Sequence, residues 1–109
     1  MEEKKFSIKR YSTNPEFDAL LRKMGEIHDK KRKDYASGDP LGNFCEALRV
    51  GVTPLQGIMV RIGDKYSRAC NIIKNKGKHE VKDETLEDTL LDSAIYYLLA
   101  ILIHRREKK

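Results

Sequence analysis

The chain has 109 residues, of which 36% are charged, and it carries a formal net charge of +5. This length fits a single domain, and the longest apolar run, residues 94–103, is far shorter than the ~20 residues of a membrane-spanning helix. The N-terminus shows no apolar signal-peptide segment, and Cys45 and Cys70 form no Cys-x-x-Cys pair. We therefore expect a cytoplasmic protein with two reduced, mostly buried thiols rather than a disulfide.

The first half of the chain predicts one long and one short helix after a polar N-terminal arm, residues 1–13. A long helix is expected from Pro15 to Tyr35, because apolar side chains recur there at three- and four-residue spacing and Asn14 can cap its start. Residues 36–40 read Ala-Ser-Gly-Asp-Pro and are expected to end it. A short helix is then predicted over residues 44–50.

The second half predicts two long helices. The third helix begins at Pro54, where Thr53 and Gln56 have capping-box spacing, and it is expected to end at Gly77. Its apolar spacing predicts a buried stripe made of Leu55, Ile58, Met59, Ile62, Tyr66, Ala69 and Ile73. The fourth helix is expected from Asp83 to Arg106, and its last turn is rich in cations that suit the negative end of the helix dipole.

These elements predict an all-α domain over residues 14–109. The expected architecture is a small bundle of about four helices, in which the two long C-terminal helices pair antiparallel. A chain of this size has little core to spare, so we expect self-association into a dimer or larger homo-oligomer to complete it.

Acidic residues gather where the fourth helix is expected to begin. Residues 80–92 hold six carboxylates and one lysine, a sum of −5, so the other 96 residues carry +10. At about 100° per residue, Glu84, Asp88, Asp92 and Tyr96 form one stripe beside the apolar arc of this helix. Asp92 lies too far from the helix start to be stabilised by the dipole, so we expect it to have a partner.

Two interpretations of this stripe remain open. In the first, Arg61 and Arg68 of the third helix form salt bridges with the acids, and Asp64 pairs with Arg68. In the second, carboxylates bind Mg²⁺, and a metal-activated water attacks a phosphoanhydride whose oxygens contact basic side chains of the third helix. The predicted catalytic and metal-binding residues are Asp64, Glu84, Asp88 and Asp92. The predicted nucleotide- and phosphate-binding residues are Arg61, Lys65, Arg68, Lys33 and Tyr96.

Two segments carry a family resemblance. Residues 61–68, Arg-Ile-Gly-Asp-Lys-Tyr-Ser-Arg, and residues 83–96, Asp-Glu-Thr-Leu-Glu-Asp-Thr-Leu-Leu-Asp-Ser-Ala-Ile-Tyr, look like the phage and bacterial family called nucleotide modification associated domain, first type. Lys33-Asp34-Tyr35 and Asn43-Phe44 look like its upstream signatures, so the resemblance spans roughly residues 28–103. It implies a role in nucleotide metabolism in a bacterial cell, in a protein that a phage could encode.

A weaker resemblance is to the all-α nucleoside triphosphate pyrophosphatases of the MazG type. Glu84-x-x-Glu87 and the later Asp88 and Asp92 are similar to the acidic motif of their second metal-binding helix, whereas the Glu-x-x-Glu of the first is absent here. The resemblance implies Mg²⁺ as cofactor and a nucleoside triphosphate as substrate.

Three functions follow from the sequence. The first is Mg²⁺-dependent pyrophosphohydrolysis of a nucleoside triphosphate. The second is non-catalytic binding or sequestration of a nucleotide or nucleotide signal, and the third is a purely structural pair of interacting helices.

The basic run Lys30-Lys31-Arg32-Lys33 fits either a solvated helix end or a phosphate contact. We expect no membrane partner, because the longest apolar run is too short to span a bilayer. We expect no nucleic-acid partner, because no helix-turn-helix or aromatic-interleaved basic motif is evident.

Overall fold

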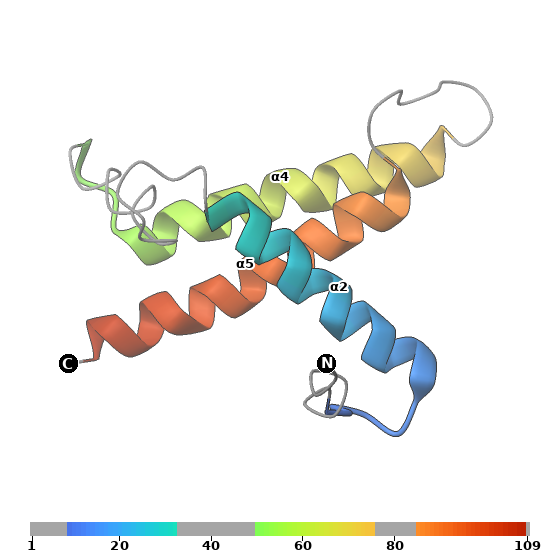
Figure 1. Cartoon of the computed structure of the whole chain (residues 1–109). Coiled ribbons are helices and arrows are strands. Elements are labelled where there is room, and N and C mark those ends of the chain that lie inside the picture. The colour runs from blue at the N-terminus through green and yellow to red at the C-terminus, as the bar shows by residue number, and fades with distance from the viewer. Residues whose placement is uncertain (1–8, 33–49, 76–84, 109) are drawn as a thin grey trace.

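The computed structural model describes three segments of the chain, residues 9–32, 50–75 and 85–108. These segments form three helices and no strand: α2 (Pro15–Arg32), α4 (Pro54–Lys74) and α5 (Leu86–Glu107). In Figure 1, α4 and α5 run side by side in opposite directions, and α2 crosses α5. The predicted all-α class is confirmed, whereas the short helix predicted over residues 44–50 lies almost wholly outside the described residues.

The start of α2 is set by the residue that the sequence predicts. The side-chain oxygen of Asn14 accepts hydrogen bonds from the backbone N–H groups of Glu16 (3.0 Å) and Phe17 (3.1 Å). Two N–H groups that would lack an intrahelical partner are thereby satisfied, and Pro15 is tolerated because its position needs no donor.

A hydrogen-bonded cluster around Asp18 holds the segment before α2 against the helix. The Asp18 carboxylate accepts from the backbone N–H groups of Tyr11 (2.6 Å) and Ser12 (3.3 Å), and it pairs with Arg22 Nε at 3.0 Å. Arg22 also donates to the carbonyl of Lys9, and its guanidinium lies 5.6 Å from the centre of the Tyr11 ring. The Tyr11 N–H, followed by the side chain of Arg22, lowers the pKa of the Asp18 carboxyl. No sequence pattern predicted this role of Asp18.

Helix α4 begins as predicted and ends earlier than predicted. Gly51 has a φ of +79°, a left-handed conformation that favours glycine, and it turns the chain just before the cap. The Thr53 hydroxyl accepts from the Gln56 N–H at 3.1 Å while the Gln56 side chain accepts from the Thr53 N–H at 3.0 Å, which is a complete capping box. The predicted end at Gly77 is wrong, because the helix ends at Lys74 and Asn75 caps it.

Helix α5 begins three residues later than predicted. Thr85 has extended backbone, its hydroxyl accepts from the Asp88 N–H at 3.1 Å, and the Asp88 carboxylate accepts from the Thr85 N–H at 3.3 Å. This second capping box fixes Leu86 as the first helical residue, so the predicted start at Asp83 is wrong. The Thr-x-x-Asp spacing that marks this start is visible in the sequence.

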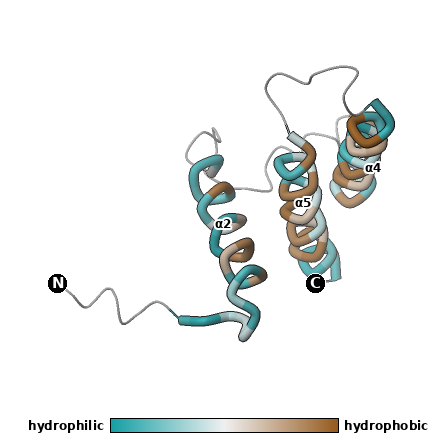
Figure 2. Tube along the Cα trace, turned by 90° about the vertical axis from the view of Figure 1, so that its right-hand side faces the viewer, coloured by the Kyte–Doolittle hydropathy of each residue, from teal (hydrophilic) through white to brown (hydrophobic). Residues whose placement is uncertain are grey.

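The core lies mainly between α4 and α5. Its buried side chains are Ile58 and Ile62 of α4 and Ile95, Leu99, Ala100 and Ile103 of α5. Met24 and Ile27 of α2 pack against it from the other side, and Figure 2 shows α5 between α2 and α4, with apolar positions on each helix. None of the described helices combines the length and the apolarity that crossing a bilayer requires.

Part of the buried stripe predicted for α4 is exposed. Met59, Tyr66 and Ile73 are 47%, 70% and 60% exposed, so the prediction that they are buried is wrong. These side chains lie beside the row of Ile58, Ile62 and Ala69 that faces α5, and a single neighbouring helix covers only that row. Cys70 lies near the same side and is an exposed free thiol, contrary to the predicted burial.

Candidate functional site

Helical spacing and antiparallel packing bring four of the predicted site residues together. Arg61 and Lys65 are four residues apart on α4, and Asp92 and Tyr96 are four residues apart on α5, so each pair lies on one face of its helix. Because the helices run in opposite directions, Lys65 meets Asp92 and Arg61 meets Tyr96.

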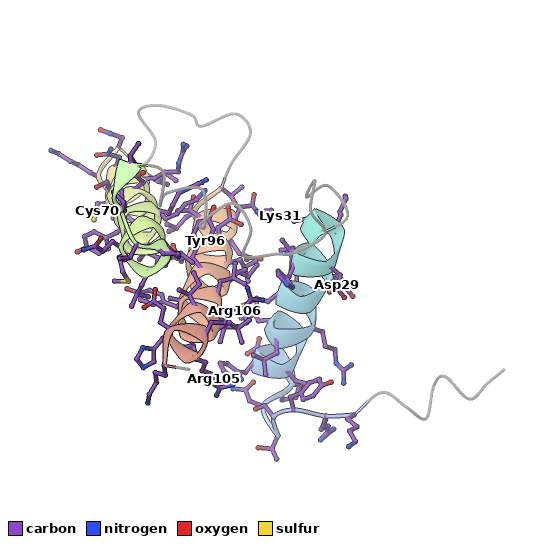
Figure 3. The ribbon with its side chains drawn as sticks, turned by 90° about the vertical axis from the view of Figure 1, so that its left-hand side faces the viewer. Asp29, Lys31, Cys70, Tyr96, Arg105 and Arg106 are labelled. Carbon is purple, nitrogen blue, oxygen red and sulfur yellow. The ribbon has the colours of Figure 1, made fainter. Side chains whose placement is uncertain are left out.

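The contacts extend to all three helices. Lys65 Nζ lies 3.1 Å from Asp92 Oδ2, and Lys31 Nζ of α2 lies 3.5 Å from Asp92 Oδ1. Arg61 Nη1 donates to the Tyr96 hydroxyl at 3.5 Å. Figure 3 labels Lys31 on α2 and Tyr96 on α5, on the two sides of this junction. We call these five residues, Lys31, Arg61, Lys65, Asp92 and Tyr96, the Asp92 cluster.

The Asp92 cluster is partly shielded from water and predominantly cationic. The side chains of Lys65 and Asp92 are 20% and 22% exposed, so their attraction is screened less than that of an ordinary surface pair. Lys31 is 49% exposed and closes the cluster at its outer edge. Two lysines contact the one carboxylate, and Arg61 contacts the Tyr96 hydroxyl one turn along α5, so these five residues have a formal charge of +2. Such an arrangement suits the oxygens of a phosphate.

The predicted partner of Asp92 exists, and it is a pair of lysines, Lys31 and Lys65. Lys65 was expected to bind phosphate but not to pair with Asp92, and Lys31 was noted only as part of a basic run. The run was visible in the sequence, but its position beside Asp92 depends on how α2 crosses α5.

The described carboxylates do not gather into a metal site. Asp88 is held in the capping box, both oxygens of Asp92 contact lysines, and Asp64 lies about 140° around α4 from the side that packs on α5. Among residues 9–32, 50–75 and 85–108, no three His, Cys, Asp or Glu side chains are placed to hold a metal ion. Glu84 lies outside the described residues, as does Lys33. The four-carboxylate Mg²⁺ site therefore stays a prediction.

An apolar groove adjoins the Asp92 cluster along the seam of α2 and α5. It has a volume of about 700 Å³, within the range of small-molecule sites. Its apolar floor consists of Leu21, Met24, Ile95, Leu98, Leu99 and Leu102. Its polar edge consists of Tyr11, Arg22, Glu26, His28 and Asp29. His28 is three residues before Lys31 and Ile95 is three residues after Asp92, so the groove starts one helical turn from the cluster.

The remaining predicted site residue, Arg68, is exposed on α4, seven residues after Arg61 and hence near the same face of the helix.

No family model, curated protein or solved structure matches the chain. The resemblances carried by the motifs of α4 and α5 therefore stay predictions.

Proposed function

We propose that this protein binds a nucleotide, with the phosphates at the Asp92 cluster and the nucleoside in the groove between α2 and α5. The observation that carries the proposal is the convergence of Lys31, Arg61 and Lys65 from two helices on one carboxylate and one phenol. The family resemblance of the segments that contain Arg61, Lys65 and Asp92 points to the same class of ligand.

Each member of the cluster has a chemical role in this proposal. The ammonium groups of Lys31 and Lys65 donate charge-assisted hydrogen bonds to phosphate oxygens. Asp92 holds both lysines in place, so they lose less conformational freedom when the ligand arrives. Arg61 adds a planar donor with several N–H groups, oriented by the Tyr96 hydroxyl.

The groove supplies the contacts for a base and sugar. Its leucine floor buries the apolar faces of a base, and its volume of about 700 Å³ admits a nucleoside. The carboxylates of Glu26 and Asp29 at its edge are acceptors for the amino group of a base or the hydroxyls of a ribose. A ligand that extends from cluster to groove therefore meets donors for its phosphates and acceptors for its nucleoside.

The second candidate function is Mg²⁺-dependent pyrophosphohydrolysis, which the MazG-type resemblance implies. One observation favours it, namely that the partly buried Asp92 carboxylate lies beside the proposed phosphate-binding lysines. The described carboxylates alone do not fit Mg²⁺, because two lysines engage Asp92 and the cap engages Asp88. Binding of a nucleotide at the lysines needs no metal ion.

The proposal extends to cell location and assembly. Free nucleotides are cytoplasmic ligands, so we place the protein in the cytoplasm of a bacterial cell, whether its gene is bacterial or phage-borne. We also propose that the functional form is a homo-oligomer, because the described helices leave large apolar side chains exposed.

The test is titration calorimetry with ATP and with inorganic triphosphate, each with Mg²⁺ and with EDTA. Lys65→Met should weaken binding of both ligands about tenfold or more, which is the loss of one charge-assisted contact. Leu98→Ser in the groove should weaken ATP binding and leave triphosphate binding unchanged. The matched control is Lys74→Met, an exposed lysine at the end of the same helix as Lys65, which should bind like the wild type.

Equal affinity of the Lys65→Met and Lys74→Met proteins for ATP would refute the site. Pyrophosphate release measured on the same nucleotides separates the two candidate functions. Turnover that requires Mg²⁺ would support hydrolysis, whereas binding without turnover would support sequestration.

A further inference from the structure

The hairpin of α4 and α5 exposes a second surface on the side opposite the Asp92 cluster. Six large apolar side chains on it are 47% to 70% exposed: Met59, Tyr66 and Ile73 of α4 and Leu90, Tyr97 and Ile101 of α5. We call these six residues the hairpin face. Isolated exposed apolar residues are ordinary on protein surfaces, but a contiguous set drawn from two packed helices marks an interaction site.

Helical geometry places the two stripes on one side of the hairpin. At about 100° per residue, the three α4 residues fall within about 40° of one another, and so do the three α5 residues. The α4 stripe lies about 100° from Lys65, and the α5 stripe lies about 160° from Asp92. Because the helices are antiparallel and Lys65 meets Asp92, both stripes face away from the cluster on the same side.

The hairpin face carries almost no charge. Between its large side chains the described helices place only small or uncharged residues: Gly63 and Cys70 on α4 and Ser93 and Ala94 on α5. Figure 3 shows Cys70 on the side of α4 that points away from α2. Ionisable groups lie at its borders: Lys74 at the end of α4, Glu87 one turn before Leu90, and Arg105 one turn after Ile101 on α5. The uncharged centre of the hairpin face can meet an identical centre without repulsion.

The exposed area suits a dimer. Side chains of this size that are half exposed or more offer roughly 100 Å² each, so the hairpin face provides roughly 600 Å² per copy and about 1,200 Å² for a pair. That is the lower end of the range of specific interfaces.

We infer that the hairpin face is the docking surface for a second copy of this chain, related by a two-fold axis, so that two α4–α5 hairpins form a four-helix core. In such an isologous interface each apolar stripe packs against the stripe of the other copy. The Asp92 cluster stays on the outer side, so a dimer presents two copies of it. This inference stands on burial and geometry and is independent of the proposed nucleotide binding.

Sedimentation equilibrium of the full chain tests the inference. The wild type should have twice the monomer mass of 12.6 kDa at micromolar concentration. Tyr66→Glu and Tyr97→Glu each place a carboxylate on both sides of the interface, and each should raise the dissociation constant at least about 100-fold. The matched control is Val60→Glu, because Val60 is 64% exposed and lies about 120° around α4 from Tyr66. This variant should remain dimeric.

Circular dichroism shows whether each variant is folded. Folded, monomeric Tyr66→Glu and Tyr97→Glu proteins beside a dimeric Val60→Glu protein support the inference. A wild type that is monomeric at about 100 µM overturns it, since the face would then serve a different partner. An oligomer that survives both tyrosine substitutions, or that Val60→Glu disrupts equally, also overturns it.

Discussion

Removing the carboxylate of Asp92 should destabilise the protein more than removing the ammonium group of Lys65, one of the two lysines that contact it. Asp92→Asn removes both ion pairs of the carboxylate and leaves the ammonium groups of Lys31 and Lys65 facing each other across a neutral amide. Lys65→Met removes one pair, keeps the contact with Lys31, and preserves the packing of the lysine stem. The two losses of stability differ because the single Asp92 carboxylate forms ion pairs with two lysines.

The magnitude follows from the burial of the groups. The side chains of Lys65 and Asp92 are 20% and 22% exposed, so the pair is neither fully exposed nor fully buried. A surface ion pair contributes about 0–1 kcal/mol to stability, and breaking a buried pair costs about 3–5 kcal/mol, so we expect a value between these limits. We expect a loss of about 2 kcal/mol for Asp92→Asn and about 1 kcal/mol for Lys65→Met, with a coupling free energy of about 1 kcal/mol between them.

Urea denaturation measures these losses, and it is done at a fixed protein concentration because the proposed self-association would make stability depend on concentration. The Asp92→Asn midpoint should fall by about 1 M relative to the wild type. Equal losses for the two single variants, or a coupling below about 0.3 kcal/mol in the double-mutant cycle, would refute the shared-carboxylate arrangement.

Three further predictions follow from the helix caps, the core and the segment before α2. Thr85→Ala should cost about 1 kcal/mol in urea denaturation, because the Asp88 N–H loses its acceptor, and Thr85→Ser should restore most of that loss. Ile58→Ala should cost about 2–5 kcal/mol because the side chain is fully buried, whereas the exposed Val60→Ala should change stability by less than about 0.5 kcal/mol. The pKa of Asp18 is lowered from 3.8, so its stabilising contribution is present above that pH and is lost as the pH falls through the folded-state pKa. A carboxyl titration by NMR should place the Asp18 midpoint below 3.8, and a midpoint at or above 3.8 would contradict the contacts with Tyr11 and Arg22.

The sequence predicted those features of the fold that depend on local chemistry. The caps at Asn14 and Thr53 depend on side chains that bond their own neighbours, so spacing alone identifies them. The predicted start of α5 at Asp83 is three residues too early, because the capping box of Thr85 and Asp88 sets Leu86 as the first helical residue. The burial of Tyr66 was wrong because periodicity shows which residues share a face, but not how much of that face a neighbour covers.

The candidate site was predictable only in part. The need of Asp92 for a partner followed from its place beside apolar residues, and its distance from the helix start excluded the dipole as the explanation. The identity of that partner depended on the register of α4 against α5 and on the crossing of α2, which bring Lys65 and Lys31 to it. Contacts across such long sequence separations are set by tertiary packing and leave no mark in local spacing.

The most direct test of the proposed function is an NMR titration of the isotopically labelled wild type with ATP. Binding at the Asp92 cluster should perturb the side-chain signals of Lys31, Lys65 and Arg61 and the ring of Tyr96, while Lys74 at the end of α4 stays unchanged. Perturbations at Lys74 and at the basic C-terminal end of α5 without any at Lys65, or no perturbation at millimolar ATP, would contradict a nucleotide site at this cluster.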